Sequence, residues 1–205
     1  MRRSHLFLVC LGTVGCGGYG SPASFPVTTA EYGKLVPRLP PCAQAVQLVL
    51  EDLRADRSVI GQRFMENTPG TRYPIQMQGD ALVYVGNALT LRLQQAGAPA
   101  PAGSQATLSV QLLQLTIDES IYYNSEYSAQ TTLQLALKSS SSPQPCWQGQ
   151  VYATASNYGR SASTVNYQET LDRLMDAAIA QLVKTSGFSD ALCGKCMGLT
   201  VTVSH

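Results

Sequence analysis

The sequence predicts an α+β two-layer sandwich: an antiparallel sheet with two helices on one face, in the order β-(β)-α-β-β-β-α. Three long segments, 107–118, 127–137 and 147–158, alternate apolar and polar side chains with the period of a strand. Two others, beginning near Asp80 and Asn166, repeat apolar residues with the period of a helix. The short connections between the long strands favour antiparallel pairing, and the apolar face of their sheet needs a covering layer of helices.

Shorter elements precede the first helix. Residues 45–50 alternate in polarity and predict a half-buried strand, whereas residues 51–62 are polar and charged and predict a loop or bend. Thr68-Pro69-Gly70 is typical of a turn. Residues 72–77 predict a short strand, which Pro74 restricts to an edge of the sheet because proline has no N–H to donate.

The two helices carry start and stop signals. The first is expected to begin with Asp80 as its N-cap and to end at Gly97. The second is expected to begin with Asn166 as its N-cap, with Glu169 three residues later completing a pattern like a capping box, and to end at Gly187. Both apolar stripes are interpreted as core.

The three long strands give the sheet two different faces. In the first strand the alternation changes phase between Leu112 and Leu113, which predicts a β-bulge there. One face of the sheet is apolar, and the other is rich in uncharged polar side chains. This second face is either simply solvated or a surface for a protein partner, since tyrosine is favoured at interfaces. The residues predicted for the partner surface are Gln134, Gln150, Tyr152 and Tyr158.

The N-terminus predicts export. Arg2 and Arg3 precede a short apolar run at 6–11, which is far shorter than the about 20 apolar residues that cross a bilayer and is typical of a secretory signal. The small residues that lead into Cys16 resemble the lipobox of bacterial lipoproteins, with Thr13 as a departure from it. The resemblance implies cleavage before Cys16 and a lipid on that cysteine. Plain secretion with cleavage near Gly20 is the alternative.

These signals divide the chain into three parts. Residues 1–15 are a lipoprotein signal peptide, residues 16–41 are the lipidated cysteine and a flexible tether rich in Gly, Ser and Pro, and residues 42–205 are a single periplasmic domain. The absence of an aspartate after Cys16 favours the outer membrane, on its periplasmic face, by the same lipoprotein resemblance.

Composition argues against several classes of function. Charged residues are 13% of the chain, and the loss of Arg2 and Arg3 leaves 12 basic against 13 acidic residues with no basic cluster, so nucleic-acid binding is not expected. The two histidines are His5 and His205, which leaves no histidine within the fold for a Ser-His-Asp triad or a zinc site. We therefore predict no enzyme, no cofactor and no metal. Paired carboxylates remain an alternative, and the candidates are Glu51, Asp52, Asp56, Asp118, Glu119 and Glu126.

Four cysteines remain after processing: Cys42, Cys146, Cys193 and Cys196. In an oxidising compartment they predict structural disulfides, either joining Cys42 or Cys146 to the C-terminal pair or joining Cys193 to Cys196. The C-x-x-C spacing also leaves open a thiol–disulfide protein or a closed zinc site. Residues 199–203 alternate and predict a final strand at the edge of the sheet.

The order of elements carries a resemblance. Asp56-Arg57 before Ile60-Gly61, the segment ATLSVQLLQLTID, and the tyrosines at 122, 123 and 127 resemble the YajG-like outer-membrane lipoproteins over about residues 42–188. The resemblance implies a non-enzymatic, lipid-anchored binding or adaptor module that meets envelope proteins. The same plan is similar to the auxiliary lipoproteins of ABC-type intermembrane lipid transporters, which implies a partner-docking or lipid-handling subunit.

Overall fold

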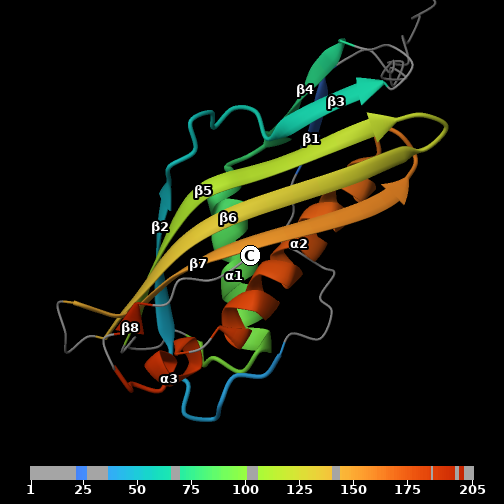
Figure 1. The fold of residues 1–205 in the computed structure, drawn as a ribbon. Helices are drawn as coiled ribbons and strands as arrows, with labels where there is room; N and C mark the ends of the chain where they lie inside the picture. Colours follow the sequence, from blue (N-terminus) through green and yellow to red (C-terminus); the bar gives the residue numbers. More distant parts are fainter. Residues whose placement is uncertain are drawn as a thin grey trace, which may run out of the picture.

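A computed structural model describes residues 22–26, 37–65, 70–100, 106–139, 144–185, 187–196 and 199–200. These residues form one mixed sheet of eight strands, with helices α1 and α2 side by side on one of its faces (Figure 1). The elements in chain order are β1 (Ala23–Pro26), β2 (Val46–Asp52), β3 (Gly61–Met65), β4 (Arg72–Gln78), α1 (Ala81–Gln95), β5 (Ala106–Ile121), β6 (Ser125–Ser139), β7 (Pro145–Gly159), α2 (Thr164–Lys184), α3 (Phe188–Leu192) and β8 (Leu199–Thr200).

The three predicted long strands are confirmed as the centre of the sheet. β5 pairs antiparallel with β6, and β6 pairs antiparallel with β7, over almost their whole lengths. The register of β5 against β6 shifts between Leu112 and Gln114, which confirms the predicted bulge. The extra residue returns Leu115 and Ile117 to the buried face, where Leu112 also lies.

The predicted wholly antiparallel sheet is wrong, because β5 is long enough to pair with two shorter strands along one edge. β2 runs parallel to its first half, from Val46 opposite Ala106, and β3 runs parallel to its second half, with Arg63 opposite Glu119. The loop predicted over 51–62 therefore lies between two strands and is shorter than expected. β3 begins at a glycine because a Cβ on Gly61 would lie 1.7 Å from the carbonyl oxygen of Ile117.

The tether prediction is wrong for Ala23–Pro26, which forms β1 and pairs parallel with β4. Phe25 is buried and its ring stacks on Tyr167 with centroids 4.7 Å apart. β1 begins opposite Ile75, one residue after Pro74, so β4 is an edge strand only at its start. This is why the missing N–H of Pro74 is tolerated. Further along the predicted tether, Leu39 is also buried.

The helix signals are partly confirmed. Asp80 caps α1 by accepting from the N–H of Leu82, and the helix stops before Gly97, whose φ is 109°. The predicted cap of α2 is wrong: the N-cap is Ser163, whose side chain accepts from the N–H of Asn166. Glu169 accepts instead from the Asn157 amide at 3.0 Å. Serine is as good a cap as asparagine, so the chain becomes helical three residues earlier.

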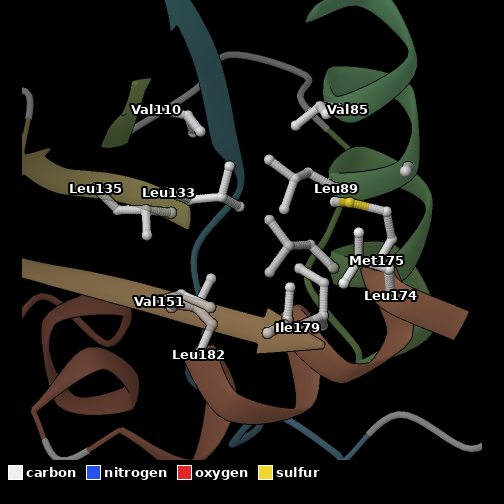
Figure 2. Close-up of a cluster of buried hydrophobic side chains, with 14 of the residues drawn as sticks. Val85, Leu89, Val110, Leu133, Leu135, Val151, Leu174, Met175, Ile179 and Leu182 are labelled. Carbon is white, nitrogen blue, oxygen red and sulfur yellow. The ribbon is translucent and has the colours of Figure 1, made fainter. Parts of the chain in front are cut away.

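The core lies between the helices and the sheet, as the prediction of two helices on one face requires. Figure 2 shows side chains of both helices pointing at those of β5, β6 and β7. Burial of each large aliphatic side chain contributes about 1.5–3 kcal/mol. Among the described helices, we find none that combines the length and the apolar character needed to cross a membrane. The labelled core residues are Val85, Leu89, Val110, Leu133, Leu135, Val151, Leu174, Met175, Ile179 and Leu182.

Two disulfides join distant parts of the chain at the end of the sheet where β5 begins. Cys42 bonds to Cys193 across 151 positions, and Cys146 bonds to Cys196 across 50 positions. The predicted link between the C-terminal cysteines and Cys42 or Cys146 is confirmed, and the alternative of a local bridge between Cys193 and Cys196 is wrong. The predicted last strand is confirmed at Leu199–Thr200, which pairs parallel with β7. The rest of that prediction, 201–203, lies outside the described residues.

We expect peptide mapping under non-reducing conditions to recover these two crosslinked pairs. In the chain-entropy model, closing loops of these lengths stabilises the fold by about 5 and about 4 kcal/mol when each bridge is taken alone. Urea unfolding with and without a reductant should therefore show a large loss of stability on reduction. Free thiols in protein from an oxidising compartment would contradict the prediction.

Candidate functional site

The face of the sheet opposite α1 and α2 is the candidate site, and we name it the open face. Figure 1 shows this side of β5, β6 and β7 uncovered by helices. Every second side chain of β6 and β7 points away from the core onto this face, and these side chains are polar and almost uncharged. Its central members are Gln130, Thr132, Gln134, Gln148, Gln150, Tyr152 and Thr154.

Three of the four predicted partner-surface residues lie together at the centre of the open face. Gln134 of β6 is directly opposite Gln150 of β7, and Tyr152 is the next outward residue along β7. The Tyr152 hydroxyl lies 3.4 Å from the side-chain oxygen of Gln130, and Tyr152 is 39% exposed. The cross-strand register thus forms a patch of amides beside an aromatic ring.

Tyr158, the fourth predicted residue, lies apart from this patch. It is six residues beyond Tyr152 along β7, a distance of about 20 Å. Its hydroxyl donates to Glu126 at 3.1 Å, and this hydrogen bond raises the pKa of Tyr158. Tyr158 is 69% exposed, at the end of the sheet that also carries the β5–β6 turn with Tyr122 and Tyr123.

The central patch is suited to bind another protein. Amide side chains donate and accept hydrogen bonds without the desolvation cost of a full charge. Tyrosine supplies apolar area with a polar tip, and it is enriched among residues that contribute most to interface energy.

A second cluster is buried between the sheet and α2, around Glu119, one of the predicted candidate carboxylates, whose partners the sequence analysis did not predict. The carboxylate of Glu119 accepts from Arg63 Nε at 2.6 Å and from the hydroxyl of Tyr167 through one oxygen. Its other oxygen accepts from Ser125 at 2.7 Å and from the Ala162 N–H at 2.8 Å. Glu119 is 0% exposed, so it holds elements together and is not positioned to meet a substrate.

The hydrogen bonds of this cluster decide its protonation. Burial by itself would raise the pKa of Glu119, but the bonds from Tyr167, Ser125 and Ala162 and the charge of Arg63 together hold it below its ordinary value. Burial and the adjacent carboxylate raise the pKa of Tyr167 far above its ordinary value. Glu119 is therefore ionised and Tyr167 is neutral at physiological pH.

Another buried cluster joins the two helices. Tyr84 of α1 donates to Asp172 of α2 at 2.9 Å, and Arg92 of α1 donates to Asp176 at 2.5 Å. Burial raises the pKa of Asp172, and it also raises that of Tyr84. These contacts fix the position of α1 beside α2, and Asp172 also accepts from the Gln168 amide at 3.1 Å.

The predicted carboxylates do not come together as an acid–base pair. Glu51 accepts from Gln111, Asp52 pairs with Arg54, and Asp56 accepts from Ser58. Asp118 accepts from the N–H of Gln62, and Glu126 accepts from Tyr158. Within the described ranges no group of three metal-binding side chains is present. Cys16 lies outside the described residues.

The sequence contains a signal for the burial of Glu119, which was named only as a candidate for acid–base chemistry. Glu119 shares the alternation phase of Leu115 and Ile117, so its inward direction follows from the strand period. A carboxylate in that position needs buried partners. Arg63 gives no such signal, because no strand was predicted there and the loop expected over 51–62 covers only the first two residues of β3. The Tyr122-Tyr123 pair is visible in the sequence, but its exposure depends on how the strands end.

Comparison with known proteins identifies a similar fold. The crystal structure of protein XCC0632 from Xanthomonas campestris, of family model DUF330, matches with a TM-score of 0.53 at 14% identity over 84% of this chain and 98% of that chain. The structure of the hypothetical protein CT253 from Chlamydia trachomatis matches with a TM-score of 0.38 at 11% identity, over 73% of this chain and 99% of that chain. The crystal structure of an uncharacterized protein matches with a TM-score of 0.31 at 13% identity, over 79% of this chain and 94% of that chain. No family model and no curated protein matches the sequence. None of these comparisons identifies a YajG-like protein, so that resemblance stays a prediction.

We expect Glu119→Gln to destabilise the protein by about 3 kcal/mol or more at pH 7, because it leaves the Arg63 guanidinium buried without its counter-charge. The pKa of Glu119 is lower in the folded state than in the unfolded state. Its contribution to the free energy of unfolding is therefore complete above about pH 4.5 and is lost as the pH falls through the folded-state pKa. The difference in free energy of unfolding between the variant and the parent should therefore become smaller at acidic pH.

Urea unfolding of parent and variant from pH 7 to pH 3 measures this effect. Glu126→Gln is the matched control, since Glu126 is exposed in β6 and its replacement should change stability by no more than about 0.5 kcal/mol. Equal stability of the Glu119 variant and the parent at pH 7 would refute the structural role.

Proposed function

We propose that this chain is a lipid-anchored lipoprotein of the bacterial cell envelope whose domain is a non-enzymatic adaptor that binds a protein partner through the open face. The observation that carries the proposal is the patch of Gln134, Gln150 and Tyr152 on a sheet face that the helices leave uncovered. The N-terminal signal that ends at Gly15-Cys16 supports the anchor and the outer-membrane location.

Photo-crosslinkers placed at positions 134 and 150 in living cells test the adaptor role. We expect them to capture one discrete envelope protein, because the two side chains are directly opposite each other and would face the same partner surface. A crosslinker at exposed position 83, on α1 and on the other side of the sheet, is the matched control. Equal labelling from all three positions, or none, would count against the open face as an interface.

The anchor is tested by Cys16→Ser, which should leave an unprocessed precursor without lipid. Membrane fractionation and mass spectrometry of the N-terminal peptide measure the result. A variant that is still processed and fractionates like the parent would show that the chain is not a lipoprotein. Stable anchoring requires more than one acyl chain, so the parent should remain with the membrane at high salt.

The auxiliary subunit of an ABC-type intermembrane lipid transporter is the second candidate. The open face favours it over a free-standing lipid carrier, because it offers a docking surface for a neighbouring subunit. Co-purification with a permease and a substrate-binding protein would support it. A thiol–disulfide function is not proposed, because Cys193 and Cys196 are each bonded to a distant cysteine.

A further inference from the structure

Exposed aromatic and apolar side chains gather at the end of the sheet where β5 turns into β6. We name this the tyrosine end, and it comprises Tyr122, Tyr123, Tyr158 and Val165, which are 54%, 87%, 69% and 55% exposed. Figure 1 shows the β5–β6 turn, the end of β7 and the start of α2 close together there. The end therefore presents a cluster, not a single exposed ring.

The tip of the cluster is preorganised and uncharged. Tyr122 and Tyr123 meet edge to face with ring centroids 4.4 Å apart, and the turn is completed by Asn124. Tyrosine rings with an apolar body and a polar hydroxyl are enriched at the headgroup level of membranes. A turn without a charged side chain loses little solvation when it enters that region.

The direction of β1 places its first residue, Ala23, toward the tyrosine end. β1 runs parallel to β4, β4 runs antiparallel to β3, and β3 runs parallel to β5, so β1 runs antiparallel to β5. Ala23 pairs with Ile75 of β4, and Ile75 pairs with Gly61 of β3. The carbonyl of Ile60, next to Gly61, accepts from the N–H of Ile117, so Ala23 lies at the level of Ile117 on β5. Along the strand direction Ala23 is thus about four residues, or about 13 Å, short of the end of β5. Because β4 and β3 lie between β1 and β5, three interstrand spacings add about 14 Å sideways, and the full separation is about 20 Å.

The chain length between Cys16 and Ala23 restricts how the domain can face the membrane. Seven residues span at most about 25 Å when fully extended. That length exceeds the separation of about 20 Å between Ala23 and the end of β5. The opposite end of β5, at Ala106, is eleven residues from Ile117, or about 36 Å, which is beyond reach. A lipid on Cys16 could not hold the disulfide end against the bilayer.

We propose that the tyrosine end contacts the headgroup region of the same membrane leaflet that holds the lipid of Cys16. This inference rests on the proposed lipidation. In this orientation the long strands point away from the membrane. The open face is then roughly perpendicular to the membrane surface, where a second envelope protein can reach it. The binding surface is a lipid headgroup layer, and Tyr122 and Tyr123 contact it first.

Fluorescence quenching in vesicles tests the proposal. The full-length lipidated protein carrying Tyr123→Trp is returned to phosphatidylethanolamine–phosphatidylglycerol vesicles that contain a lipid with a nitroxide on its headgroup. We expect the introduced indole to lose most of its emission. The parent is the matched control, since its single tryptophan, Trp147, is buried near the opposite end of β7. Tyr152→Trp, at the middle of the open face, is the second control and should not be quenched.

Flotation of the same vesicles separates the two proposals. Protein that floats and shows quenching at position 123 alone supports the inference. Protein that floats with no quenching at 123, or with equal quenching at 123 and 152, overturns the inference and leaves the anchor intact. Protein that does not float refutes the lipid anchor, and the inference falls with it.

Discussion

The ionised carboxylate of Glu119 is the constraint on which the arrangement of this fold depends. A buried charge is costly unless every oxygen is satisfied, so its donors must all be in place at once. Those donors come from β3, from the start of β6, from the turn after β7 and from α2. Phe25 stacks on one of them, Tyr167, and so attaches β1 to the same cluster.

This cluster also fixes the position of the tyrosine end. Ser125 and Tyr127 bind the Glu119 carboxylate at the start of β6, directly after the turn that carries the exposed tyrosines. Ala162 adopts a left-handed φ of 57°, and its N–H donates to the same carboxylate. The ends of β5, β6 and β7 are therefore fixed relative to one another, and the exposed rings are presented from a rigid base.

The opposite end of the sheet is held by different means. Cys146 lies at the start of β7 beside Trp147, whose ring packs edge to face on Phe188 of α3. The two disulfides fasten the segment after α3 to β7 and to the chain before β2. α3 itself is only five residues long and packs through the buried side chains of Phe188 and Leu192. One end of the molecule is thus held by buried polar contacts and the other by crosslinks, and the open face lies between them.

The sequence by itself determined the three long strands, the bulge after Leu112, the start of α1 at Asp80 and the presence of structural disulfides, because each follows from local periodicity, capping chemistry or residue type. Only the tertiary structure decided the parallel pairing of β1, β2 and β3, the partners of each cysteine and the burial of Glu119. These depend on contacts between residues far apart in the chain. A four-residue strand such as β1 carries too short a pattern to be recognised in a segment rich in Gly and Pro. It becomes a strand because β4 offers it an edge and Tyr167 offers Phe25 a ring to stack on.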